Sequence, residues 1–311
     1  MIVAPPVPLP PDADSQAYVT VHALLVGGLW LPYNEVFQDC INEPHTVGSE
    51  IPCFAFLITH PKYGRSLFDL GMRKHAKGWP PGVDAAVEAF DVARHCEEDV
   101  VDALRKGGVD PAEITKVIYS HLHWDHVGDP LPFKNASIVV GSDAKTLLEN
   151  AYPKNPKSRI MELPAHMPAD YIDFANPQQY ARVAPWGPYE RAVDVYSDGS
   201  FYLIDSPGHM PGHLSATARV APDTFIFLAG DTCHNRLCFA PGERLVSEEN
   251  HADIETARAT VRRLVRLDTE YPNIVTIIAH DAALKEVLPF FPGPDLRQWA
   301  LGEVGKRKVG A

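Results

Sequence analysis

Short runs of apolar residues recur along the chain after residue 116, and each run is followed by a histidine or an aspartate. The runs span residues 117–119, 201–204, 225–229 and 274–279. Runs of this length, bounded by Gly, Pro and polar residues, are typical of strands buried in a sheet. The polar residues that follow them are His121, His209 and His213, Asp231, and His280. Because strand ends converge at one edge of a sheet arrangement, we expect these side chains to lie close together.

The remaining hydrophobic pattern predicts strands in alternation with amphipathic helices. Strands are expected at residues 18–26, 51–59, 66–70 and 136–140, and an apolar loop at 29–37. Helices are expected at residues 84–93, 97–106 and 253–267. The last helix carries its apolar residues on one face, which is typical of a helix that covers a sheet. This order predicts an α/β protein with two mixed β-sheets packed face to face and helices outside.

Residues 152–190 break this regular pattern, since they are rich in proline and aromatic residues. The segment is too apolar for a disordered linker and too interrupted for a long helix. A lid or a pocket wall is the function typical of a long irregular insertion. A surface elaboration or a dimer contact is the alternative. Because the candidate ligands run from His121 to His280 without a linker-like stretch, we expect a single domain over residues 1–311.

The sequence His121-Leu122-His123-Trp124-Asp125-His126 places three imidazoles and a carboxylate within one short loop. These are the ligand types that zinc and similar divalent metals prefer. A structural role for a lone histidine would be ordinary, but this density of ligand types indicates a metal site. His209 and His213 in a Pro-Gly-rich turn, Asp231 and His280 offer the further ligands that a site with two ions needs.

On these motifs the chain resembles the metallo-β-lactamase superfamily, and within it the dinuclear-zinc lactonases such as the N-acyl homoserine lactonases. Phe68-Asp69-Leu70-Gly71 is similar to the early Asp-x-Gly turn of that family. The resemblance implies the αβ/βα sandwich, with the metals in a cleft between the sheets. Asp69 is expected to support the ligand loops rather than to act directly.

The resemblance also implies a ligand set for two divalent ions, for which zinc is the expected metal. It assigns His121, His123 and His213 to the first ion and Asp125, His126 and His280 to the second. Asp231 would bridge the two ions. His209 is expected to be a residue of the loop or its surroundings rather than a ligand.

The implied activity is hydrolysis of a cyclic ester or amide by a hydroxide that bridges the two ions. Asp125 is expected to pass a proton to the leaving group. The family's lactonases carry a tyrosine three residues after the bridging aspartate, whereas this chain has His234 there. His234 is therefore a candidate to contact the substrate carbonyl, and it puts acyl homoserine lactones themselves in question. Trp30, Tyr33 and Trp186 are the aromatic candidates for binding a flat ring.

Two other activities share this scaffold and stay open at the level of sequence. A thioesterase would use the same hydroxide chemistry. A mononuclear iron oxygenase or persulfide dioxygenase would need fewer ligands than this chain offers. Metal content distinguishes the iron enzyme from the hydrolase.

Charge and composition limit the kinds of partner that we expect the protein to bind. The formal net charge of -12 argues against nucleic acid, because phosphate binding requires a basic surface. Five cysteines without a Cys-x-x-Cys pair, and a start without a signal-peptide pattern, lead us to expect a cytoplasmic protein. The sequence has no apolar run long enough to cross a membrane. The expected partner is a small cyclic substrate, and a homodimer remains compatible with the sequence.

Overall fold

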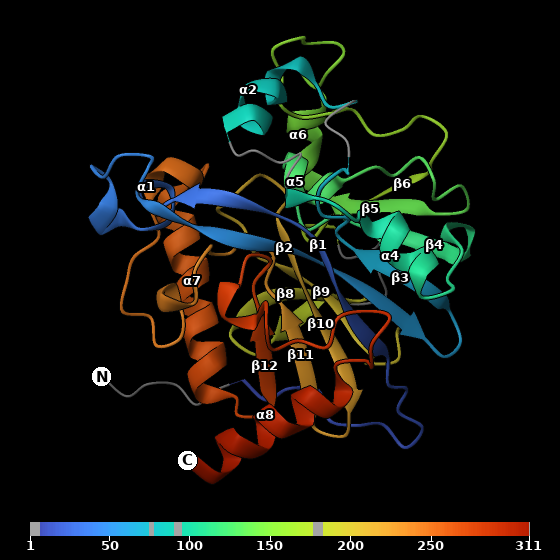
Figure 1. Cartoon of the computed structure of the whole chain (residues 1–311). Helices are drawn as coiled ribbons and strands as arrows, with labels where there is room; N and C mark the ends of the chain where they lie inside the picture. Colours follow the sequence, from blue (N-terminus) through green and yellow to red (C-terminus); the bar gives the residue numbers. More distant parts are fainter. Residues whose placement is uncertain (1–6, 75–77, 90–94, 177–182, 311) are drawn as a thin grey trace.

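The computed structural model describes residues 7–74, 78–89, 95–176 and 183–310. Its strands form two mixed six-stranded sheets (Figure 1). The first sheet has the order β1 (Thr20–Pro32), β2 (Gly48–His60), β3 (Gly64–Phe68), β4 (Ile114–Ile118), β5 (Ser137–Gly141) and β6 (Ala169–Ile172). The second has the order β12 (Ile274–Ile277), β11 (Thr224–Leu228), β10 (Leu214–Ala221), β9 (Phe201–Asp205), β8 (Tyr189–Asp194) and β7 (Val183–Trp186).

The two sheets face one another across a common hydrophobic core. Phe54, Phe56 and Ile118 of the first sheet belong to the same buried cluster as Leu203 and Ile226 of the second. Inner-face residues of strands pack in this way because alternate side chains point to the same side of a sheet. The predicted arrangement of two mixed sheets packed face to face is therefore confirmed.

Helices cover the outer faces of the sheets. The helix α4 (Val100–Lys106) packs Leu104 against residues of the first sheet, and α7 (Ile254–Glu270) packs Leu264 and Leu267 against the second. The helix α8 (Arg297–Gly310) contacts β10, β11 and β12 on the other side, and its Ala300 and Val304 join the core between the sheets. The shorter helices are α1 (Tyr33–Val36), α2 (Pro81–Ala89), α5 (Trp124–Val127) and α6 (Lys145–Leu148). Single 3₁₀ turns are η1 (Gln38–Cys40), η2 (Pro111–Glu113), η3 (Ser142–Ala144), η4 (Arg236–Cys238), η5 (Glu248–Asn250) and η6 (Ala282–Leu284).

Local sequence explains where the two main outer helices begin. The Asp253 carboxylate accepts a hydrogen bond from Thr256 N at 3.0 Å, which caps the first turn of α7. Asp99 and Asp102 form a capping box at the start of α4. The predicted helix 97–106 thus begins later, at Val100, because Asp99 serves as its cap.

The prediction of a loop at residues 29–37 is wrong for residues 29–32, which belong to β1. A register shift between Leu25 and Gly28, with Gly27 at φ 107°, allows β1 to continue to Pro32. A bulge of this kind turns the strand without ending it. Leu29 and Leu31 are buried while Trp30 between them is not, as strand alternation requires.

Residues 152–190 are also more regular than predicted. They contain β6, at the edge of the first sheet, and β7 with the start of β8, at the edge of the second. Parallel pairing of β6 with β5 and antiparallel pairing of β7 with β8 give these residues ordinary sheet partners. Residues 177–182 of the segment lie outside the described residues. The segment therefore links the two sheets, and its role as a lid stays a prediction.

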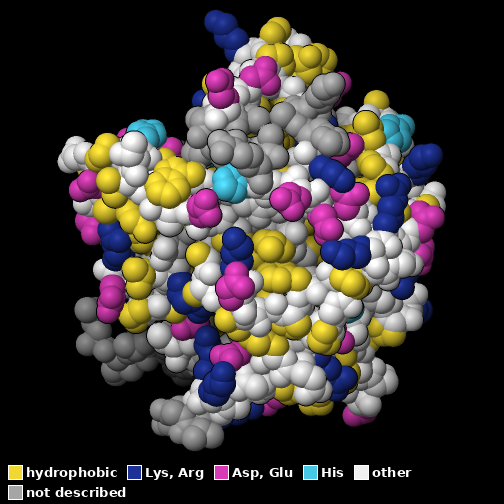
Figure 2. All heavy atoms as spheres, viewed as in Figure 1, with side chains coloured by type: hydrophobic (Ala, Val, Ile, Leu, Met, Phe, Trp, Pro, Cys, Tyr) yellow, Lys and Arg dark blue, Asp and Glu magenta, His cyan; other side chains and the backbone are white. Residues whose placement is uncertain are grey.

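The face shown in Figure 2 carries basic and acidic side chains in mixture, in keeping with the acidic net charge of -12. Among the helices that the structure describes, none has the length and apolar character needed to cross a bilayer.

Candidate metal centre

The loop after β4 is held in place by Asp69. The Asp69 carboxylate is buried and accepts hydrogen bonds from Ser120 N and Ser120 Oγ, both at 2.7 Å, and from His126 Nδ1 at 2.9 Å. The Leu70 amide donates to the His126 carbonyl at 2.8 Å. Asp69 has a φ of 59°, a conformation that Asp tolerates better than most residues. These contacts confirm that Asp69 supports the ligand loop.

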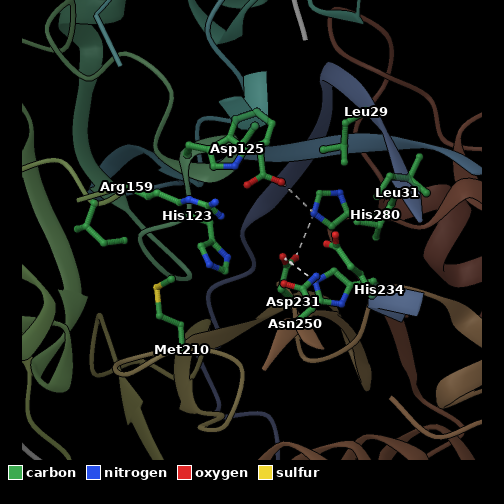
Figure 3. Close-up of a pocket in the computed structure, with 15 residues that line it drawn as sticks. Leu29, Leu31, His123, Asp125, Arg159, Met210, Asp231, His234, Asn250 and His280 are labelled. Atoms are coloured by element: carbon green, nitrogen blue, oxygen red, sulfur yellow. Dashed lines mark hydrogen bonds and ion pairs between the residues drawn. The ribbon is translucent and has the colours of Figure 1, made fainter. Parts of the chain in front are cut away.

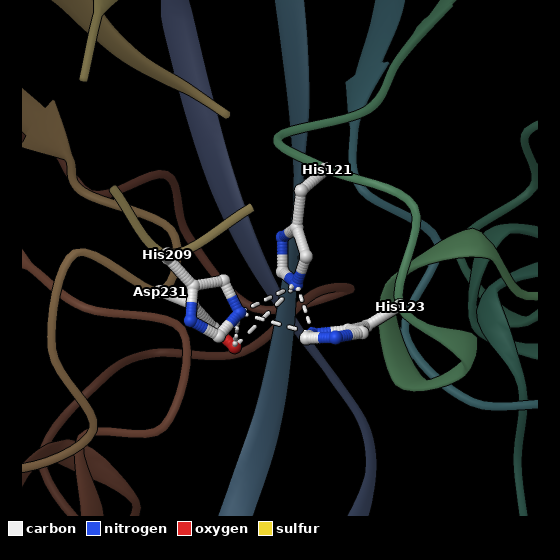
Figure 4. A group of neighbouring side chains, drawn as sticks. All are labelled: His121, His123, His209 and Asp231. Carbon is white, nitrogen blue, oxygen red and sulfur yellow. Dashed lines mark hydrogen bonds and ion pairs between the residues drawn. The ribbon is translucent and has the colours of Figure 1, made fainter. Parts of the chain in front are cut away.

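The first group of candidate ligands consists of His121, His123, His209 and Asp231, which converge in Figure 4. His121 Nε2 lies 2.9 Å from His123 Nδ1 and 3.2 Å from His209 Nε2, and the last two atoms are 3.0 Å apart. Asp231 Oδ2 is 3.7 Å from the Nε2 atoms of His121 and His209. Ligands of a tetrahedral zinc ion are about 3.3 Å apart, so this spacing fits such an ion.

The second group consists of Asp125, His126 and His280, and it shares Asp231 with the first. His126 Nε2 is 3.2 Å from Asp231 Oδ2, and His280 Nε2 is 3.4 Å from Asp231 Oδ1. Asp125 Oδ2 lies 3.5 Å from His280 Nε2 and 3.8 Å from His126 Nε2. The Asp231 carboxylate thus lies between the two groups, with Oδ2 near both of them and Oδ1 toward His280, where a bridging ligand would stand.

Hydrogen bonds at the far ring nitrogens leave the near nitrogens free to bind a metal. His126 Nδ1 donates to Asp69, and His280 Nδ1 donates to the Pro52 carbonyl at 2.8 Å. His121 Nδ1 lies 3.0 Å from Ser120 Oγ. Such outer partners fix the tautomer of a ligating histidine. Among the described residues, His126 Nε2 and Asp231 Oδ1 are buried without a hydrogen-bond partner, which is costly unless a ligand satisfies them.

The electrostatics of the centre suit a cation. Burial lowers the pKa of His123 to about 4, so its ring is neutral and able to coordinate at pH 7. Burial also opposes the charge on His126, but the carboxylates of Asp231, Asp69 and Asp125 outweigh it and hold the pKa of His126 well above its usual value. The field of these carboxylates, which attracts a proton here, would equally attract a divalent ion.

The structure contradicts the prediction that His213 is a ligand. His213 Nε2 accepts a hydrogen bond from the Asp231 amide at 3.0 Å, and Nδ1 lies 2.9 Å from the Ser206 carbonyl and from Ser206 Oγ. Both ring nitrogens are therefore used inside the protein. His209, which the sequence analysis kept out of the ligand set, points Nε2 into the first group instead.

A cavity of about 210 Å³ opens above the two groups (Figure 3). Its polar lining includes Asp125, Asp231, His234 and His280, so the predicted catalytic residues Asp125 and His234 do face it. His234 Nε2 lies 3.2 Å from Asp231 Oδ2 and 3.4 Å from Asn250 Nδ2. The apolar part of the lining includes Trp124.

Three of the predicted substrate-binding residues are not part of this lining. Trp30 points away from Leu29 and Leu31, and its Nε1 donates to the His45 carbonyl at 3.0 Å. Tyr33 packs edge-on against Phe37, with ring centroids 5.6 Å apart. Trp186 is 1% exposed and stacks on Phe227 in the core outside the second sheet. The burial of Trp186 in the core contradicts its predicted role in substrate binding, whereas the roles of Trp30 and Tyr33 stay predictions that the cavity lining does not support.

Several residues of the site gave no signal in the sequence. Glu35, Arg159 and Asn250 line the cavity, and His251 lies beside the centre, 5.2 Å from the His209 ring. Cys53 Sγ lies 3.7 Å from His280 Nδ1, the same ring nitrogen that donates a hydrogen bond to the Pro52 carbonyl. Single polar residues in loops carry no periodic pattern, and only Cys53 could have been flagged, as a thiol within a buried strand.

Comparison with known proteins identifies the family of this chain. A model of the metallo-β-lactamase superfamily matches residues 78–276. The chain belongs to the metallo-β-lactamase superfamily. Gamma-lactamase FDB1 of Fusarium pseudograminearum is 28% identical over 339 residues, which cover 93% of this chain and 79% of that protein. The predicted family is therefore confirmed.

A second relative is much longer than this chain. The cytochrome P450 monooxygenase mpaDE' of Penicillium brevicompactum is 30% identical over 283 residues, which cover 82% of this chain and 32% of that protein. The chain thus spans about a third of the length of the first curated relatives it matches. Among solved structures, a quorum-quenching N-acyl homoserine lactone lactonase covers 91% of this chain at a TM-score of 0.66 and 20% identity, with all of that chain matched. This likeness confirms the αβ/βα sandwich of the superfamily.

Proposed function

We propose that this member of the metallo-β-lactamase superfamily is a hydrolase that opens a lactone or lactam ring with two divalent ions, for which the donor set favours zinc. The observation that carries the proposal is the Asp231 carboxylate, which lies between the two groups of ligand atoms. Its Oδ2 is 3.7 Å from His121 Nε2 and 3.2 Å from His126 Nε2, and its Oδ1 is 3.4 Å from His280 Nε2. The gamma-lactamase and lactonase relatives support a cyclic amide or ester as substrate.

In this proposal His121, His123 and His209 hold the first ion with Asp231. Asp125, His126 and His280 hold the second ion with the same carboxylate. The ions would supply Lewis acidity to the ring carbonyl and a nucleophile derived from water near neutral pH. A mononuclear oxygenase would not need Asp125, His126 and His280 as ligands. The complete second group therefore argues against that activity.

Asp125 is placed to move a proton during ring opening. It lines the cavity, and its side chain is 12% exposed, while the carboxylate of Asp231 below it is 3% exposed. One Asp125 oxygen lies near His126 and His280, and the carboxyl group still borders the space where a ring would sit. A carboxylate in this position can accept a proton from the nucleophile and deliver it to the departing oxygen or nitrogen.

His234 is placed to hydrogen-bond the substrate carbonyl from the side of Asn250. We expect His234→Phe to lower kcat/KM about a hundredfold, because one aimed donor to a developing oxyanion contributes about that much. His234→Tyr restores a donor and should recover most of the loss. Steady-state kinetics and metal analysis of both variants check this. Loss of bound metal in His234→Phe would instead make His234 a ligand and contradict the assigned role.

The proposed function is tested with the purified chain and a panel of lactones, lactams and thioesters, followed by acid release. We expect ring opening that chelation abolishes and zinc restores. Preferential hydrolysis of thioesters would replace the proposal with a thioesterase, and oxygen uptake with thiol substrates would replace it with the oxygenase. A cytoplasmic location and a homodimer stay predictions.

A further inference from the structure

Two side chains of opposite charge line the cavity without a hydrogen bond or ion pair to the described residues. Glu35 and Arg159 both border it. Neither side chain forms a hydrogen bond or an ion pair with any residue in the described part of the chain. Most of the other arginines of the chain bind a carboxylate or a carbonyl, as Arg236 binds Asp281 at 2.5 Å. Unpaired charges in a pocket wall are what a site leaves open for its ligand.

Backbone hydrogen bonds, rather than the carboxylate, hold Glu35 in place. The short helix α1 begins where Tyr33 N donates to the Val47 carbonyl at 2.8 Å, and it ends where Ser247 N donates to the Val36 carbonyl at 3.2 Å. The Glu35 side chain contributes nothing to either anchor. Burial raises the pKa of Glu35, against the opposing effect of His45, His234 and Arg159. The carboxyl group is thus partly removed from water without a hydrogen-bond donor among the described residues, so it gains from a ligand that donates to it.

Arg159 stands on the other side of the cavity. Figure 3 shows it beyond His123, on the side away from Leu31 and His280. Its neighbour Ile160 accepts a hydrogen bond from the Tyr152 amide at 2.8 Å. Arg159 itself is exposed, which places its guanidinium at the mouth of the cavity rather than at its floor.

Apolar side chains share the cavity wall with the polar ones, and the space is small. Leu29, Leu31, Ile51 and Met210 line it. Its volume of about 210 Å³ is below the range of about 300–1,000 Å³ that is typical of pockets for drug-sized ligands. A substrate of one or two fused rings fits this space, and its polar substituents would meet Glu35 or Arg159.

We propose that Glu35 and Arg159 are specificity-determining residues that select a small ring bearing a hydrogen-bond donor toward α1 and an anionic or carbonyl oxygen toward the mouth. Glu35 receives a hydroxyl or a ring N–H, and Arg159 receives the oxygen. The inference rests on the proposed function, because the ring must also present its scissile carbonyl to Asp231 and its neighbours.

The Glu35 half is tested with dihydrocoumarin and its ring-hydroxylated isomers. In the wild type we expect kcat/KM of at least one hydroxylated isomer to exceed that of dihydrocoumarin about 10–100-fold. Glu35→Leu should bring this ratio close to one. The ratio compares the same two esters in two proteins, so intrinsic reactivity and the folded fraction cancel. Glu43→Gln, an exposed Glu outside the cavity, is the matched control and should keep the wild-type ratio.

The Arg159 half is tested with a carboxylate-substituted dihydrocoumarin. Arg159→Met should remove the preference for the charged ester over the neutral one, and added salt should weaken that preference in the wild type. Lys157→Met removes a positive charge from the same loop, outside the cavity lining, and should leave the preference intact.

Different results would overturn this inference and the proposed function. If the wild type hydrolyses rings but shows no preference, or if Glu35→Leu and Arg159→Met keep the preference, this inference is overturned and the proposed function stands. If the wild type hydrolyses no ring of the panel, both are overturned.

Discussion

Replacing Asp231 with Asn is expected to lower ring hydrolysis about a hundredfold to a thousandfold, the size of effect that follows the loss of one electrostatic stabiliser of a transition state. Metal content should fall from about two ions per chain to about one or fewer. The reason is the position of the carboxylate between the two groups: Oδ2 lies 3.7 Å from His121 Nε2 and 3.2 Å from His126 Nε2, and Oδ1 lies 3.4 Å from His280 Nε2. Asn keeps the shape of the side chain but supplies no negative charge to share between two cations.

Kinetics and elemental analysis of the same preparation check this prediction. Asp223→Asn, at an exposed turn with φ 53° where Asn is well tolerated, is the matched control and should keep wild-type activity and metal. Retention of about two ions and of full turnover by the Asp231→Asn variant would show that the carboxylate does not bridge.

The second prediction separates His209 from His213. His209→Gln should lose the first ion and about a hundredfold or more in activity, because its Nε2 lies 3.0 Å from His123 Nδ1 within the ligand group. His213→Gln should retain both ions when metal is in excess. Its expected effect is a loss of stability of about 1–3 kcal/mol, since the buried Asp231 amide and the Ser206 carbonyl would lose their partner.

Metal analysis at saturating zinc, together with urea unfolding, distinguishes the two variants. The opposite pattern, with metal lost in His213→Gln and retained in His209→Gln, would return the first ion to the ligand set inferred from sequence. Equal metal loss in both would mean that the turn acts as one unit.

The sequence could identify most of the metal centre because its ligands follow strands. His121, Asp231 and His280 each stand directly beyond a buried run, and a sheet brings such positions to one edge. The choice between His209 and His213 could not be made in this way, because both occupy one turn between β9 and β10. It depends on the direction that Gly208, at φ 126°, and Gly212, at φ 78°, give to the backbone, and on the Asp231 amide that arrives from another strand.

The residues that line the cavity were harder to predict from the sequence than the metal ligands. Trp30 and Trp186 looked like ring-binding residues because they are large and aromatic, yet strand register turns Trp30 away and core packing takes Trp186. Glu35 reaches the cavity because α1 is held by hydrogen bonds to Val47 and Ser247, which are distant in the sequence. Contacts of this kind leave no local pattern in a sequence.

The most direct test of the dinuclear centre is a titration of zinc into metal-free protein, with bound metal and ring hydrolysis measured at each point. The account predicts saturation at about two ions per chain, with activity that rises only as the second ion binds. Full activity at about one ion per chain, or hydrolysis that persists in the metal-free protein, would contradict it.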